Sequence, residues 1–270
     1  MEINPVRKEE SFKSGLSNGV KTGCCGFPVA RQKYFRHFNV VELQQTFYQP
    51  PRLETAMKWR KDAPPEFEFT LKIWQLITHP PESPTYRKLN QAIPEKKKKY
   101  YGFFKPTDEV FSAWEEMNRI ADVLKARAVV FQCPASFKPT GGNKQNLKRF
   151  FSSIERKDFY LVWEPRGPWQ KEEIKALCED LGLIHCVDPF KEESLYGEIA
   201  YFRLHGKDGY RYQYTDEELK ALMAKVRQRK TLNYVMFNNV YMFEDARRFS
   251  ELNKSRIGLN MKGGRSDAEC

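Results

Sequence analysis

Short apolar runs recur along the chain, and most of them end in polar or reactive side chains. Eight candidate strands follow from these runs, at residues 19–24, 39–43, 67–73, 128–132, 158–163, 183–187, 198–204 and 233–238. A parallel strand buried on both faces reads as a continuous apolar run, and ligands bind where such strands end. The repeated pattern therefore predicts that the polar residues after each strand meet at one site.

Helix-like segments separate most of these runs. Mixed charged and apolar positions predict helices near residues 30–36, 52–60, 110–124, 144–155, 170–180, 215–228 and 242–254. Thr107 and Thr215 supply N-terminal caps, and Gly182 stops the fifth helix. This alternation is typical of an α/β protein, here a single TIM-like (β/α)₈ barrel. KEESLYGE, between the sixth and seventh strands, is too short for a crossover helix, so we expect irregularity there.

The length and composition fit one domain. A chain of 270 residues that is 40% hydrophobic has the size of one such barrel. Polar, aperiodic ends predict a flexible segment over 1–18, the barrel over 19–255 and a flexible tail over 256–270. The chain has no apolar stretch that approaches the roughly 20 residues needed to span a bilayer, and no secretory signal, so we expect a cytoplasmic protein. No pattern indicates the oligomeric state.

The cysteines lack the spacing of a zinc finger or a disulfide framework. They stand at Cys24, Cys25, Cys133, Cys178, Cys186 and Cys270. We expect most of them to be reduced and buried, because unpaired cysteine is among the most buried residue types. Three of them fall near the ends of predicted strands, so a thiol close to the site is an alternative.

Seven short segments follow one another over about residues 21–250, namely GCCGFP, VVELQQTFYQPP, FTLKIWQLITH, VVFQCPASF, LVWEPRGPW, YFRLHG and YVMFNN. In order and spacing they resemble the motifs of the domain-of-unknown-function 72 family, also called YecE-like. The resemblance implies a TIM-like barrel and a site at its strand ends, but no settled activity. The chain departs from the family pattern at the pair Cys24–Cys25 and in the long basic segment after the third strand.

Period-two alternation predicts which side chains face the barrel axis. Val162, Glu164 and Arg166 share one face, while Leu161 and Trp163 pack against helices. The same phase places further polar residues inside, namely Glu42, Lys72, Gln132, Asp188, Arg203, His205 and Asn238. Buried charges in such number are costly unless they are paired or used, so their convergence favours a functional site.

Each of these residues has a structural and a chemical interpretation. Glu164 and Arg166 are either an ion pair that braces the rim or a general acid or base with an anion clamp. The predicted catalytic residues are Glu164, His205, Glu42 and Asp188. The predicted substrate-binding residues are Lys72, Gln132, Arg166, Trp169, Arg203, Asn238 and Tyr48, with the two aromatic rings available to stack on a ring or base.

The segments after the seventh and eighth strands, RLHGKDGYRY and FNN, stand where many TIM barrels bind phosphate. A hydrogen-bonded histidine in a glycine turn is the alternative for His205. His79, His205, Glu42, Glu164 and Asp188 are also potential metal ligands, as in barrels of the endonuclease IV type. Because Lys72, Arg166 and Arg203 oppose a bound cation, we predict no cofactor and no metal ligand, with a divalent metal as the alternative.

The net charge of +11 and the pI of about 9.3 point to an anionic partner. The basic segment EKKKKYYGFFKPT at 95–107 combines lysines with aromatic rings, as surfaces that bind single-stranded nucleic acid do. Its candidate contacts are Lys96, Lys97, Lys98, Lys99, Tyr100 and Tyr101. A solvated lysine run flanked by aromatics that tuck into the core is the competing interpretation.

Two functions from different classes follow. The first is an enzyme with hydrolase-like acid/base chemistry that acts on a phosphorylated or nucleic-acid-derived substrate, with Glu164 as acid or base and His205 as its proton-transfer partner. The second is a noncatalytic nucleic-acid-binding barrel that uses the segment 95–107. A metal-dependent hydrolase or isomerase is a further alternative. The expected partner is an anionic small molecule or a single-stranded nucleic acid, and no membrane.

Overall fold

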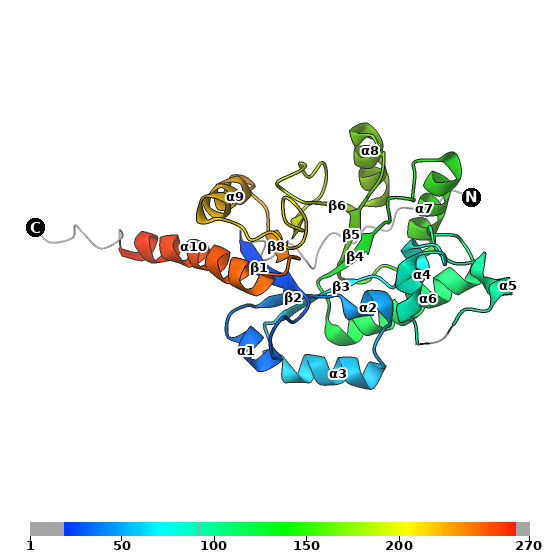
Figure 1. The fold of residues 1–270 in the computed structure, drawn as a ribbon, viewed down its shortest axis with the longest axis horizontal. Helices are drawn as coiled ribbons and strands as arrows, with labels where there is room; N and C mark the ends of the chain where they lie inside the picture. Colours follow the sequence, from blue (N-terminus) through cyan, green and yellow to red (C-terminus); the bar gives the residue numbers. More distant parts are fainter. Residues whose placement is uncertain (1–18, 91, 263–270) are drawn as a thin grey trace, which may run out of the picture.

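Eight parallel strands close into a barrel. The structure is a computed structural model that describes residues 19–90 and 92–262. The strands are β1 (Val20–Cys25), β2 (Val40–Leu43), β3 (Glu68–Lys72), β4 (Ala128–Gln132), β5 (Tyr160–Glu164), β6 (Ile184–Val187), β7 (Ala200–Leu204) and β8 (Asn233–Phe237). Each strand pairs with the next, and β8 pairs with β1, as in Val20 opposite Asn233 (Figure 1). The predicted TIM-like barrel is confirmed.

The two faces of the strands carry different residues. One buried cluster lies on the inward face and contains Val130, Val162, Cys186 and Tyr201 among others. A separate and larger cluster fills the space between the strands and the helices, and it includes Trp163. Val130 on β4 lies opposite Val162 on β5 in the parallel register, so an inward residue of one strand pairs with an inward residue of the next. The phase predicted from the sequence is therefore confirmed.

Helices surround the barrel. The longer ones are α3 (Leu53–Asp62), α6 (Asp108–Leu124), α7 (Gly141–Ser153), α8 (Lys171–Leu181), α9 (Asp216–Gln228) and α10 (Met242–Lys262), with the shorter α1 (Arg31–Phe35). The Thr215 hydroxyl accepts the Glu218 N–H at 3.2 Å, and Gly182 ends α8 in the left-handed region with φ 59°. The helix caps predicted at Thr215 and Gly182 are confirmed. Thr107 differs, because its hydroxyl donates to the Tyr100 carbonyl at 2.6 Å and does not cap α6.

Short helical turns that the sequence pattern does not predict follow the strands β2 and β3. They are α2 (Gln45–Tyr48), α4 (Gln75–Thr78), the 3₁₀ turn η1 (Pro84–Lys88) and α5 (Glu95–Lys98). Four or five residues are too few to show a helical period. No helix lies between β6 and β7, where every residue is described, so the predicted irregularity is confirmed.

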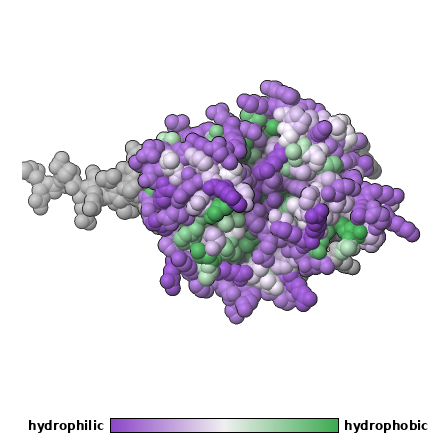
Figure 2. Space-filling model, in the orientation of Figure 1, coloured by the Kyte–Doolittle hydropathy of each residue, from purple (hydrophilic) through white to green (hydrophobic). Residues whose placement is uncertain are grey.

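The domain boundaries are only partly within the described residues. Residues 1–18 and 263–270 lie outside them, and so do the flexible ends predicted for these positions. Helix α10 continues through the predicted boundary at 255 and reaches Lys262. No helix in ranges 19–90 and 92–262 is both long and apolar enough to cross a membrane. The face shown in Figure 2 is mostly hydrophilic.

The described cysteines are free and buried, as predicted: Cys24, Cys25, Cys133, Cys178 and Cys186. Cys270 lies outside the described residues. Burial raises the pKa of the Cys24 thiol to about 12, because the thiolate would lose its hydration. Cys25 alone of the adjacent pair Cys24–Cys25 faces the barrel interior.

Candidate active site

A fully buried arginine forms the centre of the polar cluster inside the barrel. The Arg203 side chain is 0% exposed, and its Nε donates to Glu42 Oε2 at 3.1 Å. Its Nη2 lies 2.9 Å from Glu42 Oε1, and its Nη1 donates to Gln132 Oε1 at 2.9 Å and to Glu164 Oε2. Two carboxylates therefore hold one guanidinium, which gives charge-assisted hydrogen bonds of fixed geometry.

The barrel itself brings these residues together. Glu42, Gln132, Glu164 and Arg203 stand at inward positions near the carboxyl ends of four strands, and Gln132 lies opposite Glu164 in the parallel register. Neighbouring strands are about 4.8 Å apart, but the closed cylinder lets side chains of nonadjacent strands meet across its axis. Sequence positions more than a hundred residues apart thus share one ion-pair network.

The Tyr201 hydroxyl extends this network toward the middle of the barrel. It donates to Glu42 Oε2 at 2.9 Å and lies 2.7 Å from the Thr70 hydroxyl. Neither residue was among the predicted site residues. A signal existed for Tyr201, because it precedes Arg203 by two positions on β7 and therefore shares its face.

The network opens to solvent through Arg166, His205 and Asn238. Glu164 Oε1 accepts from Arg166 Nε at 3.0 Å and from Nη2 at 2.7 Å. His205 Nε2 lies 3.1 Å from Arg166 Nη2 and 3.4 Å from Glu164 Oε1, while the Asn238 amide lies 3.1 Å from Nδ1. The side chains of His205 and Arg166 are 22% and 41% exposed, so they line the mouth of the site.

The contact with Arg166 restricts the His205 ring. A guanidinium has only N–H groups, so an unprotonated Nε2 accepts from Arg166, whereas a protonated Nε2 donates to Glu164 Oε1. At the other side of the ring, Asn238 presents its amide nitrogen Nδ2 to Nδ1 at 3.1 Å, and this donor suits an unprotonated Nδ1. The ring is therefore placed to exchange a proton at Nε2.

Asp188 acts on the backbone of this site. Its carboxylate accepts the N–H of His205 at 3.2 Å and the N–H of Phe190 at 3.1 Å. These bonds tie the loop after β6 to the end of β7. Asp188 therefore positions His205 and stands outside the cluster around Arg203, although the sequence suggested a catalytic carboxylate.

The charges of the cluster shift the pKa of Glu164. Burial by itself raises the pKa of this carboxyl, but Arg203, the hydrogen bond with His205 and Arg166 outweigh it and hold the pKa well below its usual range. Glu164 is therefore an anion at neutral pH. It can fix positive groups, whereas so low a pKa makes it a weak base and leaves it without a proton to donate.

Lys72 lies in the same interior and, in the part of the chain that the structure describes, has no carboxylate partner. Its side chain is 8% exposed, and Nζ lies 3.7 Å from the centre of the Phe47 ring. Desolvation, followed by the charge of Arg203, lowers the pKa of Lys72 to about 7, although Glu164 and Glu42 act in the opposite direction. The nearby His79 is neutral, because burial and then Lys72 and Arg166 lower its pKa to about 3.

The predicted aromatic residues lie outside the ion-pair network. The Trp169 indole is buried, donates to the Phe137 carbonyl at 2.8 Å and packs against Trp163. The half-buried Tyr48 ring lies under Lys88 Nζ at 4.1 Å. Trp169 is therefore part of the packing behind β5, where the sequence suggested a stacking surface.

The basic segment 95–107 exposes most of its lysines to solvent, whereas most of its aromatic side chains are buried or half-buried. Lys96, Lys97, Lys99 and Tyr100 are exposed, and Lys98 and Tyr101 are half-buried. Phe104 is fully buried and packs against Phe131 and Phe137, and Phe103 also packs against Phe137. Of the aromatic residues in this segment, Tyr100 alone is exposed. The aromatic side chains that pack into the core, as the interpretation of a solvated lysine run predicts, are therefore present.

The carboxylates do not fit a divalent cation. Glu42 and Glu164 give their oxygens to Arg203, and further contacts come from Tyr201, Gln44, Arg166 and His205. In the described part of the chain, no group of three or more His, Cys, Asp or Glu side chains is arranged to hold a metal. A cation placed here would face the guanidinium groups at close range.

The match to a known family covers most of the chain. The sequence profile of the family described as "Protein of unknown function DUF72" matches residues 30–263. The chain belongs to the DUF72 family. No curated protein matches it.

Solved structures share the fold of this DUF72 protein. A DUF72 family protein from Enterococcus faecalis is 21% identical, with a TM-score of 0.68 over 88% of this chain and 98% of the other. A second, from Thermotoga maritima, is 23% identical, with a TM-score of 0.65 over 87% and 99%. A xylose isomerase domain containing protein from Salmonella typhimurium is 15% identical, with a TM-score of 0.51 over 91% and 98%. Identities at this level show a common barrel alone.

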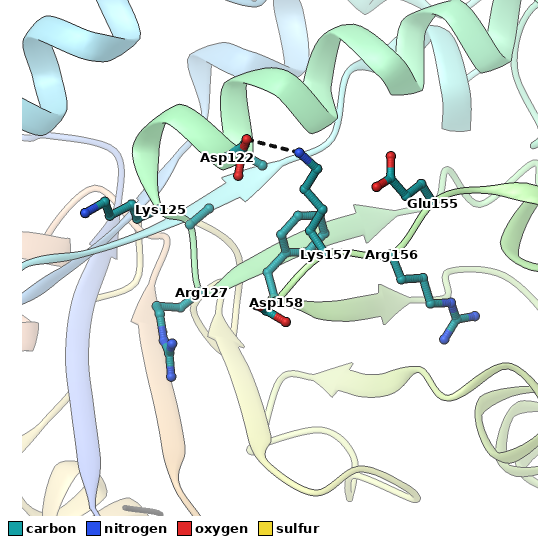
Figure 3. Close-up of a pocket in the computed structure, with 10 residues that line it drawn as sticks. Asp122, Lys125, Arg127, Glu155, Arg156, Lys157 and Asp158 are labelled. Atoms are coloured by element: carbon teal, nitrogen blue, oxygen red, sulfur yellow. Dashed lines mark hydrogen bonds and ion pairs between the residues drawn. The ribbon is translucent and has the colours of Figure 1, made fainter. Parts of the chain in front are cut away.

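A cavity of about 380 Å³ lies at the opposite end of the DUF72 barrel (Figure 3). It is lined by the loops that precede β4 and β5, including Lys125, Arg127 and Asp158. Two of its basic side chains contact other groups of the protein, since Lys157 pairs with Asp122 at 3.0 Å and Arg156 donates to the Leu181 carbonyl at 2.7 Å. In TIM barrels this amino end serves stability, so the cavity is a poor candidate for the active site.

Proposed function

We propose that this DUF72 barrel is an enzyme whose carboxyl end binds and transforms an anionic substrate, either phosphorylated or derived from nucleic acid. One observation carries the proposal. Glu164 joins the buried Arg203 to the exposed pair Arg166 and His205, so a rigid core fixes two reactive groups at the mouth. Groups held in this way cost little reorganisation when a substrate arrives.

The charge of the cluster favours an anion. Two carboxylates, Glu42 and Glu164, face the guanidinium groups of Arg203 and Arg166 and the amine of Lys72, which is about half protonated at pH 7. The positive charge of Arg203 is balanced by the two carboxylates, whereas the Arg166 side chain is partly exposed to solvent. Because Nε and Nη2 of Arg166 contact Glu164 and His205, an incoming phosphate can bind through Nη1 by charge-assisted hydrogen bonds. Its position near the ends of β7 and β8 agrees with the usual phosphate site of TIM barrels.

The geometry gives each residue a role. Arg166 binds the anion, and His205 transfers a proton at Nε2, while the Asn238 amide orients its ring. Glu164 is the anion that stabilises a positively charged His205 after it takes up a proton. Glu42, Gln132 and Asp188 hold the other groups in place.

The test separates binding from chemistry. A panel of phosphate monoesters, phosphodiesters and glycosidic substrates identifies a turned-over compound. Arg166→Gln is expected to raise the KM of that compound about tenfold or more, because a charge-assisted contact with the substrate anion is lost. His205→Asn is expected to lower kcat by about 10² or more with KM nearly unchanged. Arg119→Gln, at an exposed position on α6, is the matched control.

Two results would contradict the proposal. One is turnover of every tested compound at the same rate by wild type, Arg166→Gln and His205→Asn. The other is a substrate that only the segment 95–107 recognises: binding of a single-stranded oligonucleotide that is lost when Lys96, Lys97 and Lys99 become Gln but is unaffected by Arg166→Gln. The second result would establish the noncatalytic alternative.

A further inference from the structure

Lys72 is a buried lysine that the proposed mechanism does not use. It ends β3 at an inward position, opposite Val130 in the register with β4. Its Nζ rests on the face of Phe47, and among the described residues it forms no ion pair with a carboxylate. Both nearby carboxylates are bound to arginines instead. The amine is thus held in place by an aromatic ring and is not neutralised by an acid.

The groups around Lys72 favour its uncharged form. Arg203 on β7 and Arg166 after β5 repel the ammonium ion, whereas Glu164 and Glu42 attract it and the His79 ring is neutral. With a pKa of about 7, about half of the amine is unprotonated at pH 7. For an ordinary lysine of pKa about 10.4 that fraction is roughly a thousandfold smaller. A desolvated lysine next to other cationic groups is the usual setting of an amine nucleophile.

We propose that Lys72 forms an imine with the carbonyl carbon of a phosphorylated aldehyde or ketone. This inference rests on the proposed function, because Arg166 supplies the site for the phosphate. The lone pair of Nζ attacks the carbonyl carbon, a C–N bond forms, and the carbonyl oxygen takes a proton. The resulting hydroxyl then leaves as water when its C–O bond breaks, and the nitrogen loses its remaining proton. The net change is amine plus carbonyl to imine plus water.

The imine defines a class of reaction. Once protonated, its nitrogen accepts the electron pair of a bond broken at the neighbouring carbon, as in aldol cleavage, or of a C–H bond before elimination. His205, at the mouth of the cluster, is the nitrogen base that can receive the proton. Two arginines around an uncharged amine also suit a substrate that brings its own negative charge.

The test traps the imine by reduction. Wild-type protein is incubated at pH 7 with dihydroxyacetone phosphate or with its neutral counterpart dihydroxyacetone, and sodium cyanoborohydride converts any imine into a stable secondary amine. Intact mass and peptide mapping then locate the adduct. We expect a single adduct on Lys72, formed at least about tenfold faster with the phosphorylated ketone. Lys72→Met should lose it, and Lys58→Met, at an exposed position on α3, should keep it.

Each outcome decides one point. Adducts spread over exposed lysines without enrichment at Lys72 would overturn the inference. The proposed anion site would remain supported if inorganic phosphate raises the Tm of the wild type more than the Tm of Arg166→Gln. Equal labelling of Lys72 by both ketones would support the amine nucleophile and contradict the anion site. Peptide mapping of the wild-type protein gives the answer even if Lys72→Met fails to fold.

Discussion

Replacing Arg203 with Met removes the positive centre of a buried network and leaves two carboxylates behind. Arg203 is 0% exposed and contacts both Glu42 and Glu164. Removing one partner of a buried ion pair costs about 3–5 kcal/mol, because the other charge stays buried without compensation. We therefore expect the free energy of unfolding to fall by at least this amount at pH 7. In a domain of this size that corresponds to a drop in Tm of roughly 6–20 °C.

The pH dependence provides the sharper test. In the wild type, the depressed pKa of Glu164 contributes stability that is present above its unfolded pKa and is lost as the pH falls through the folded pKa. In Arg203→Met, we expect burial to raise the pKa of Glu164 above its unfolded value. The penalty is then present above that raised pKa and is relieved as the pH falls through it. The stability difference between the two proteins should therefore be larger at pH 8 than at pH 5.

Urea denaturation followed by tryptophan fluorescence at pH 5, 7 and 8 measures these differences. Arg166→Met is the matched control, because this 41% exposed guanidinium also binds Glu164 but is solvent-screened, and its loss should cost less than about 1 kcal/mol. Adding Glu42→Gln and Glu164→Gln to Arg203→Met should restore part of the stability, since neither position then keeps an uncompensated buried charge. A loss for Arg203→Met that is small and independent of pH would refute the reasoning.

Three further changes test other parts of the structure. Lys72→Met should stabilise the protein by roughly 3–5 kcal/mol below pH 7, where the wild type must keep a buried ammonium ion, and the gain should fade toward pH 10 in urea melts. Gly206→Ala should cost about 1–3 kcal/mol in thermal melts, because φ is +84° and the new Cβ would lie 2.1 Å from the Gly209 oxygen. Thr215→Ala should lower the unfolding free energy by about 1 kcal/mol by removing the cap of α9, and an unchanged urea midpoint would show that the cap contributes nothing.

The inward phase of the strands could be predicted because a strand repeats every two residues. Once Val162 faces inward, Glu164 must do so as well, and the same rule places Arg203 and Tyr201 on one side of β7. The failures concern residues outside the regular strands. Trp169 follows a turn at Gly167, where φ is 115°, and its orientation depends on the packing against Phe137.

The sequence by itself determined the order of the strands, the helices long enough to show a period, the barrel and most of the inward polar residues, because these follow from local periodicity and strand ends. Only the tertiary structure decided which charged side chains pair with one another. Arg203 binds Glu42 and Glu164 across the axis, Asp188 holds the backbone of His205, and Lys72 is left on the Phe47 ring. These pairings depend on barrel closure and on desolvation by distant segments, which no local pattern records.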